Sequence, residues 1–335
     1  MADDGWNIQF SDLQTLKTIG KGNFGKVFKG VYVGTEVAIK QLYYVDDEDM
    51  QKYIEREMAT LKGLRHPNIV QLLGLCKDDT GIYIVTEFIP GGDLRSKLKD
   101  DSLELSWLLR VKIAIDVAYA MNYLHSKKMI HRDLKSQNLL VCEDWKIKVC
   151  DFGFARKAEP KADFLTMCGT DEWMAPEVGL GEKYDTRADV FSYGMVLCEL
   201  VTRRKPPRRQ AGRAYAFEVK ELKTRAPPDT PPELMDLIVN CAQFYPEKRP
   251  TFRDILQDLK ELSAKLEREN PSPPPLPPVV SRSANSDDSS DSSDSSDSDD
   301  DDSSDDDSSE ESSEEFESSA AGDEELSYGG IVEED

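Results

Sequence analysis

The pattern of apolar and polar positions divides most of the chain into a short β-rich part and a longer helical part. Residues 13–45 alternate apolar and polar side chains between glycines, which predicts β-hairpins. Two further apolar runs, at 69–76 and 82–88, have the length of strands. Between them and the hairpins, the acidic residues 46–49 precede a predicted helix that reaches about Lys62, because negative charge suits a helix N-terminus.

The pattern changes to a helical period after residue 106. Residues 106–127 carry apolar side chains at helical spacing, among them Val117, Met121 and Leu124. A short strand is predicted at 147–150, and the chain beyond it is largely helical. A small β part followed by a larger α part predicts an α+β fold with a ligand cleft between two lobes.

The C-terminal fifth of the chain has a different composition. Residues 271–278 read Pro-Ser-Pro-Pro-Pro-Leu-Pro-Pro, which is extended and cannot be helical. Residues 283–335 are dominated by Ser, Asp and Glu, and they hold too few apolar side chains to offset the entropy cost of ordering. We therefore expect a lead at 1–12, a folded domain at 13–267, a Pro-rich linker at 268–282 and a disordered acidic tail at 283–335.

The negative charge belongs to the tail. The whole chain of 335 residues has a formal net charge of -23. Residues 271–335 hold 23 acidic residues and one Arg, which leaves 42 acidic and 41 basic residues in 1–270. The predicted domain is therefore electrically balanced, and the acidity says little about its site.

The cysteine pattern and the N-terminus favour a cytoplasmic protein. The six cysteines form no C-x-x-C pair, and with three histidines they do not suggest a zinc site. Scattered thiols of this kind are typical of reduced proteins. The N-terminus lacks the features of a signal peptide, and no apolar run is long enough to span a bilayer. We expect neither membrane insertion nor nucleic-acid binding.

The first candidate for chemistry is the glycine-rich run at residues 20–27. It reads Gly-Lys-Gly-Asn-Phe-Gly-Lys-Val, and its glycines Gly20, Gly22 and Gly25 would let backbone amides approach phosphate oxygens. An isolated run of this kind is more often a hairpin without a ligand. A strand follows it, so it is not a dinucleotide-binding fingerprint.

The second candidate is Lys40, which ends the run Val-Ala-Ile-Lys inside a predicted strand. A buried ammonium group needs an anionic partner, and nucleotide phosphates together with Glu57 on the predicted helix would supply one. The alternative is that Lys40 extends to the surface.

Three further motifs follow in order along the chain. Residues 131–138 read His-Arg-Asp-Leu-Lys-Ser-Gln-Asn, residues 151–153 read Asp-Phe-Gly, and residues 175–177 read Ala-Pro-Glu. Each is short, but the complete ordered set with the glycine run, Lys40 and Glu57 resembles the eukaryotic protein kinase domain over residues 13–267. Asp189 resembles the aspartate of the kinase F helix, and Arg249 resembles the arginine that pairs with the Ala-Pro-Glu glutamate, here Glu177.

The resemblance implies a bilobal kinase fold and a set of roles. It implies a β-rich N-lobe at about 13–87 with one regulatory helix and a helical C-lobe at about 91–267. It implies ATP and Mg²⁺, with Asp133 orienting the substrate hydroxyl, Lys135 steadying the γ-phosphate, and Asn138 and Asp151 binding the metal. The remaining implied nucleotide contacts are Gly20, Gly22, Gly25, Val27, Ala38, Lys40, Glu57, Thr86, Glu87 and Leu140.

Two details narrow the predicted activity. Lys135 resembles serine/threonine kinases, whereas Trp173, just before Ala-Pro-Glu, resembles tyrosine kinases. The mixture resembles the tyrosine kinase-like group, which includes Raf, mixed-lineage and many amoebal kinases. This implies a kinase for Ser and Thr of protein substrates, with some tyrosine phosphorylation left open.

Regulation and partners remain hypotheses at this point. Thr166 is the predicted site for an upstream kinase, because a phosphate there would find Arg132. The basic run 203–209, in a predicted surface loop, is a candidate docking surface for the acidic tail, although a solvated tail is the favoured interpretation. The segment 274–277 resembles a WW-domain ligand, and a stiff spacer is the favoured alternative.

Two rival functions share the same sequence. A pseudokinase or scaffold is disfavoured because the full set of catalytic residues is present. A second rival is an acidic-tail protein that binds basic partners, which salt-sensitive binding would indicate.

Overall fold

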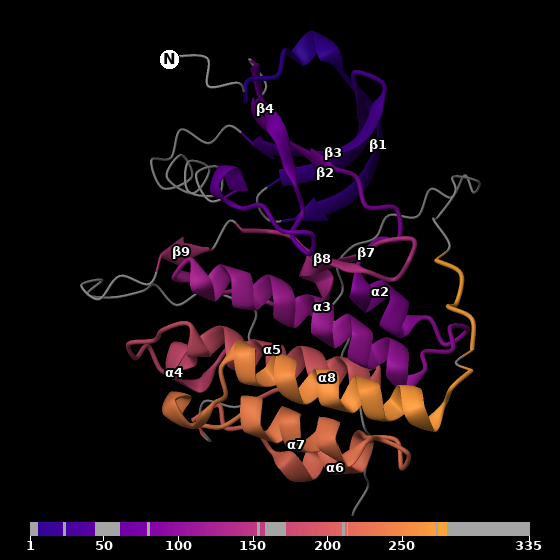
Figure 1. Cartoon of the computed structure of the whole chain (residues 1–335). Helices are drawn as coiled ribbons and strands as arrows, with labels where there is room; N and C mark the ends of the chain where they lie inside the picture. Colours follow the sequence, from indigo (N-terminus) through magenta and orange to yellow (C-terminus); the bar gives the residue numbers. More distant parts are fainter. Residues whose placement is uncertain are drawn as a thin grey trace, which may run out of the picture. The chain divides into compact units, whose positions relative to one another are not determined.

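The computed structural model describes residues 6–22, 25–43, 61–78, 81–152, 155–157, 172–209, 212, 214–272 and 274–279. These all belong to one compact unit, residues 1–283. The described part begins with a sheet and continues with helices, as the sequence pattern predicts (Figure 1).

An antiparallel five-stranded sheet forms the N-lobe, in the order β1-β2-β3-β5-β4. Its strands are β1 (Leu13–Gly22), β2 (Gly25–Tyr32), β3 (Thr35–Tyr43), β4 (Leu72–Asp78) and β5 (Gly81–Glu87). Strand β4 begins three residues later than the predicted run at 69–76. The reason is that Ile69 and Val70 instead pair with Val149 of the C-lobe, where the Val70 N–H donates to the Val149 carbonyl at 3.0 Å.

The two faces of this sheet are covered by different parts of the chain. One face holds a small apolar cluster of Val37, Ile39 and Val85 together with Ile8 of the N-terminal lead. The lead is tied to the sheet edge, because the Ile8 N–H donates to the Leu75 carbonyl at 2.6 Å. A short 3-10 helix, η1 (Phe10–Asp12), follows before β1. The lead is therefore part of the packed N-lobe.

Two long helices organise the C-lobe. Helix α3 (Trp107–Ser126) begins where the Ser106 hydroxyl accepts the Leu109 N–H, and it corresponds to the helix predicted at 106–127. Helix α5 (Arg187–Thr202) is buried on all sides from residue 188 to residue 201. Figure 1 shows α3 and α5 at the centre of the helical part.

Helix α8 (Phe252–Glu269) packs along α3. A capping box fixes its start, since Thr251 and Asp254 exchange side-chain and backbone hydrogen bonds. Its buried side chains recur at helical spacing, from Phe252 to Leu266, which produces one apolar stripe against α3.

Shorter elements complete the C-lobe and carry most of the site. The helices are α2 (Leu94–Lys99), α4 (Pro176–Gly179), α6 (Val219–Arg225) and α7 (Pro232–Cys241), with 3-10 turns η2 (Ser136–Asn138) and η4 (Pro246–Lys248). The strands form two small pairs, β6 (Met129–Ile130) with β9 (Arg156–Lys157) and β7 (Leu139–Val141) with β8 (Ile147–Val149). None of the helices in the described ranges combines the length and apolarity needed to cross a bilayer.

Candidate active site

Strand register brings the predicted nucleotide contacts of the N-lobe to one face of the sheet. Val27 lies opposite Lys40 in the β2–β3 pair, and Thr86 lies opposite Ala38 in the β3–β5 pair. Directly opposed residues share a face, and so do residues two apart on one strand. Val27, Ala38, Lys40 and Thr86 therefore line the same face, and all four are half-buried.

The glycines of the run at 20–27 differ in whether the packing of the sheet requires glycine at their position. A Cβ on Gly25 would lie 1.9 Å from the Gln41 carbonyl oxygen, so β2 approaches β3 there more closely than any side chain allows. A Cβ on Gly20 would make only ordinary contacts with Val27, the nearest of them at 3.6 Å. The packing of the sheet therefore requires glycine at position 25, whereas it would accept a side chain at position 20.

Lys40 is paired with Asp151. Its Nζ lies 3.1 Å from Asp151 Oδ1, which joins strand β3 of the N-lobe to the residue after β8 in the C-lobe. Burial raises the pKa of the Asp151 carboxyl, but Lys40, His131 and Lys135 together outweigh burial and hold the pKa below its ordinary value. The carboxylate is therefore ionised, and through Lys40 it is joined to the face of the sheet that carries Val27, Ala38 and Thr86.

Asp133, Lys135 and Asn138 form one hydrogen-bonded cluster. Lys135 Nζ lies 3.0 Å from Asp133 Oδ2, and Asn138 Nδ2 donates to the same oxygen at 3.0 Å. Asn138 Nδ2 also donates to the Asp133 carbonyl at 2.7 Å. Because its nitrogen is used for these bonds, the amide oxygen of Asn138 is oriented away from Asp133 and remains an acceptor.

Asp189 holds the backbone of the turn that precedes Asp133. Its two oxygens accept the His131 and Arg132 N–H groups, both at 2.9 Å, and the same carboxylate meets His125 Nε2 at 2.9 Å. Arg132 has a φ of 71°, which is an unfavourable conformation for a residue with a side chain. Burial raises the pKa of Asp189, but His125 and the amides outweigh it and hold the pKa low. Asp189 thus offsets the strain of the turn.

His131 connects this turn to Asp151. Its Nδ1 accepts the Asp133 N–H at 3.3 Å, so its Nε2 is the donor to the Cys150 carbonyl at 3.2 Å. Its ring lies 5.2 Å from that of Phe152, which is fully buried. Asp151 itself has a φ of 62°, a second strained position beside these predicted site residues.

Comparison with known proteins identifies this arrangement. A model of the protein tyrosine and serine/threonine kinase family matches residues 13–259. The chain belongs to this family. The α+β bilobal kinase fold predicted from the sequence is therefore confirmed.

Curated relatives of this kinase domain come from Dictyostelium discoideum. The chain is 49% identical over 268 residues to the "RasGEF domain-containing serine/threonine-protein kinase X" and 45% identical over 271 residues to the "Probable serine/threonine-protein kinase kinX". It is 37% identical over 311 residues to the "Kinase and exchange factor for Rac A". These matches cover 78%, 79% and 78% of this chain but only 28%, 25% and 24% of the relatives. The chain thus matches about a quarter of their length, and the predicted likeness to amoebal kinases is confirmed.

The pair expected between Arg249 and Glu177 is present in the kinase C-lobe. Arg249 donates through Nη1 and Nη2 to the two carboxylate oxygens of Glu177, at 2.6 and 2.7 Å. Both side chains are buried. The forked geometry joins the Ala-Pro-Glu segment to the loop before α8.

A buried carboxylate that the sequence analysis missed lies beneath residues 131–138, which we call the catalytic loop. Glu199 of α5 accepts hydrogen bonds from Ser136 Oγ at 2.7 Å and from Trp173 Nε1 at 2.8 Å, and Arg95 Nη1 lies 3.7 Å away. Burial raises the pKa of Glu199 to about 7, although Ser136, Trp173 and Arg95 oppose the shift. The signal in the sequence is a single acidic residue inside the apolar run 195–201.

Glu87 ends β5 and begins the segment 87–90 between the two lobes, which we call the hinge. Its carboxylate is directed toward residues on both sides of this connection. Its Oε1 accepts the Gln71 N–H at 2.8 Å and lies 2.7 Å from Lys148 Nζ on β8. The side chain therefore ties β5 to the start of β4 and to the C-lobe. A contact of Glu87 with adenine would involve its backbone.

The basic run at 203–209 is not the uniform surface loop that the sequence predicts. Arg203 forms the left-handed C-cap of α5 and donates to the carbonyls of Leu98 and Leu103. Arg209 donates to the Tyr215 carbonyl, and burial lowers its pKa to about 10. Only three cations of the run are exposed, and they are Arg204, Lys205 and Arg208.

Some predicted positions lie outside the described residues. These are residues 46–60 of the helix predicted to reach Lys62, including Glu57, together with Gly153, Thr166 and the acidic tail. Gly22 and Leu140 are described and lie at the end of β1 and in β7.

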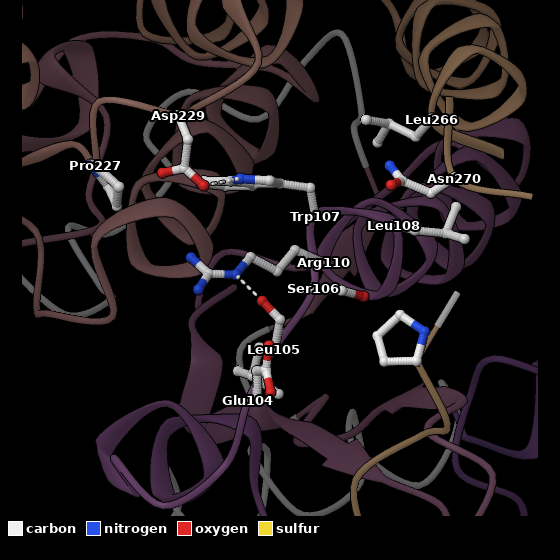
Figure 2. A pocket seen from close by; sticks show the side chains of 11 residues that line it. Glu104, Leu105, Ser106, Trp107, Leu108, Arg110, Pro227, Asp229, Leu266 and Asn270 are labelled. Atoms are coloured by element: carbon white, nitrogen blue, oxygen red, sulfur yellow. Dashed lines mark hydrogen bonds between the residues drawn. The ribbon is translucent and has the colours of Figure 1, made fainter. Parts of the chain in front are cut away.

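A pocket of about 410 Å³ opens in the C-lobe, away from the residues of the candidate active site (Figure 2). It is lined by the start of α3, the end of α8 and the loop around Asp229, where Trp107 Nε1 donates to Asp229 Oδ2 at 2.8 Å. Helix α3 has 20 residues, so about 30 Å of helix separates this pocket from the catalytic loop. None of the predicted site residues lines it.

Proposed function

We propose that this domain transfers the γ-phosphate of ATP to Ser and Thr hydroxyls of protein substrates. The observation that supports this most strongly is that two charged groups are linked through the backbone, where the Cys150 N–H, next to Asp151, donates to the Asn138 carbonyl at 2.9 Å. Lys40 with Asp151 forms the first group, and Asp133 with Lys135 and Asn138 forms the second. Phosphoryl transfer depends on alignment and charge neutralisation, which fixed groups of this kind supply.

Each residue has a role in this proposal. Lys40 binds the α- and β-phosphates, and Val27, Ala38 and Leu140 pack on the adenine. Asp133 accepts the hydrogen bond of the substrate hydroxyl and orients it toward the phosphate. Lys135 neutralises charge on the transferred group.

The donor set suits Mg²⁺ that arrives with the nucleotide. Asp151 offers an ionised carboxylate and Asn138 an amide oxygen, and Mg²⁺ prefers hard oxygen ligands in small number together with phosphates. In the described residues no three acidic, His or Cys side chains gather as a protein-only metal cage would require. When bound, the metal neutralises phosphate charge, and Asp151 and Asn138 hold it.

The acceptor class rests on Lys135 and on the naming of the relatives. Two of the relatives compared above are named serine/threonine-protein kinases. Trp173, which is typical of tyrosine kinases, is buried here and bonded to Glu199, so it supports the loop and does not by itself indicate a tyrosine acceptor.

An array of peptides with Ser, Thr or Tyr as the single acceptor tests the acceptor class. We expect the purified chain to label Ser and Thr peptides with MgATP and to label Tyr peptides weakly or not at all. Dominant tyrosine labelling would contradict the proposal. Loss of all labelling in Asp133→Asn controls for a contaminating kinase.

Regulation by an upstream kinase at Thr166 and by a WW-type reader of 274–277 remains proposed. Active enzyme that carries no phosphate at Thr166 would remove the first hypothesis. Tail docking on the basic run now has fewer exposed cations to rely on. If removal of 283–335 leaves the kinetics unchanged at low salt, tail docking is wrong.

A further inference from the structure

The Pro-rich segment after α8 lies on the surface of the C-lobe. Residues 274–279 are neither helix nor strand, and they lie close to the β7–β8 hairpin (Figure 1). Pro277 and Val279 are half-buried, whereas Leu276 between the prolines is 53% exposed. We call residues 274–279 the strap.

The first contact of the strap is with Trp145. Trp145 Nε1 donates a hydrogen bond of 2.6 Å to the Pro277 carbonyl. Prolines have no N–H, but the carbonyls of a Pro-rich segment are good acceptors, and a tryptophan N–H is a suitable donor. The strap therefore satisfies the polar end of a tryptophan whose side chain is otherwise packed in the C-lobe core, with 3% of its surface exposed.

Trp145 is presented by a strained turn. It has a φ of 63° in the turn between β7 and β8, where the Cys142 N–H donates to the Lys146 carbonyl at 2.8 Å. A tryptophan in this conformation costs free energy, which contacts elsewhere must offset. The strap bond is one such contact.

The second contact of the strap is with Gly91, just after the hinge. A Cβ on Gly91 would lie 2.6 Å from Val279 Cγ1, so the valine packs directly on the glycine backbone. Val279 also packs against the main core of the C-lobe. An apolar side chain thus anchors the end of the strap.

Gly91 connects the strap to the proposed adenine site. The Gly91 N–H donates to the Val141 carbonyl at 3.0 Å, and the Val141 N–H donates to the Gly92 carbonyl at 2.8 Å. The chain after the hinge is therefore paired with β7. Leu140, the proposed floor of the adenine site, is the neighbour of Val141 and forms a bridge with Asp93.

We propose that Trp145 and Gly91 form a docking surface for a Pro-rich segment, and that its occupant is this chain's own strap, whose docking supports nucleotide binding. Only four residues separate the end of α8 from the strap, so the strap has a high effective concentration at this surface, and an outside Pro-rich ligand must compete with it. The docking of the strap on Trp145 and Gly91 does not depend on catalysis. Its effect on nucleotide binding rests on the nucleotide site proposed above.

Matched variants of the full chain separate docking from a general effect of charge. Val279→Asp places a carboxylate in the packed position, and Leu276→Asp places the same group at the exposed position nearby. Both variants alter the same Pro-rich stretch. Trp145→Phe assigns the indole signal in spectra of protein with ¹⁵N-labelled tryptophan.

The first measurement is hydrogen exchange of the Trp145 indole N–H by NMR. We expect Val279→Asp to accelerate exchange about fivefold or more, because the bond to Pro277 opens more often. Leu276→Asp should leave the rate unchanged. Equal exchange rates in the native protein, Val279→Asp and Leu276→Asp would overturn the docking surface. Equal acceleration of exchange by Val279→Asp and Leu276→Asp would also overturn it.

The second measurement is the affinity for MgADP by calorimetry. We expect Val279→Asp to weaken MgADP about twofold to fivefold and Leu276→Asp to have no effect. A freed indole with unchanged MgADP affinity would overturn the link between the strap and the nucleotide site. If the native chain binds no MgADP, the proposed function fails, while indole exchange still decides the docking. Binding of an isolated WW domain to the native chain without faster indole exchange would also contradict an occupied strap.

Discussion

Lys40 Nζ and Asp151 Oδ1 lie 3.1 Å apart, although 111 residues separate them in the sequence. The ammonium comes from the centre of the N-lobe sheet and the carboxylate from the loop after β8. Their pairing joins the two lobes at the point where phosphates are proposed to bind. It also keeps the Asp151 carboxyl ionised, because the pKa is held below its ordinary value.

Replacement of this lysine should remove catalysis while the fold remains. We expect Lys40→Met to lower kcat/KM for MgATP by about 100-fold or more, because an oriented charge at the phosphates is lost. Steady-state kinetics with a Ser peptide measure this. Lys112→Met, which breaks an exposed pair with Glu267, is the matched control and should retain activity. A Lys40→Met enzyme within threefold of the native one would contradict the role of Lys40.

The hinge carboxylate Glu87 should contribute to stability through its two partners. Glu87→Ala leaves the Gln71 N–H without its acceptor, and we expect a loss of about 1 to 3 kcal/mol in the free energy of unfolding. Glu87→Gln keeps an acceptor, so its loss should stay below about 1 kcal/mol. Urea unfolding measures both.

A double-mutant cycle isolates the ion pair between Glu87 and Lys148. The cycle of Glu87→Gln with Lys148→Met should give a coupling of about 0.5 kcal/mol that decreases at high salt. Zero coupling at low salt would show that Glu87 acts through Gln71 alone.

Glu199 should make the stability of the domain depend on pH. Its pKa is about 7 in the folded protein against an ordinary 4.5, so the folded state retains a proton that the unfolded chain releases. Stability from this group is therefore greatest at low pH and decreases as the pH rises from 4.5 to 7. Glu199→Gln removes this dependence.

The difference in unfolding free energy between Glu199→Gln and the native protein should therefore change with pH. We expect the free energy of unfolding of the variant to increase by about 3 kcal/mol relative to that of the native protein between pH 5 and pH 8. The tail and other titrating groups are common to both proteins and cancel in this difference. A difference that stays constant over this range would show that Glu199 is ionised throughout.

The sequence predicts those parts of the site whose chemistry is carried by short motifs. Asp133, Lys135 and Asn138 lie within six residues, so the local turn brings them together, and their cluster could be expected. The alternation in 13–45 likewise predicts the hairpins, because one face of the sheet is buried. These features depend on local spacing and on residue type.

Other features depend on contacts between distant segments, which no local pattern encodes. The bond between Trp145 and Pro277 joins a hairpin turn to a segment that composition alone describes as a spacer. Arg209 is half-buried and donates to the Tyr215 carbonyl, which reverses its interpretation as a surface cation. The N-terminal lead reads as an unremarkable polar stretch, yet Ile8 fills a gap on the sheet.

Asp133 and its partners are proposed to carry out phosphoryl transfer, and a comparison of the native chain with Asp133→Asn tests this role. The transfer of γ-phosphate from MgATP to a Ser peptide is compared between the native chain and Asp133→Asn, with MgADP affinity measured for both. We predict that the variant loses about 100-fold to 10,000-fold in kcat while the affinity for MgADP stays within twofold, because Asp133 orients the hydroxyl and does not hold the nucleotide. A variant that retains the native kcat, or a native chain that binds MgADP and transfers no phosphate, would contradict the account.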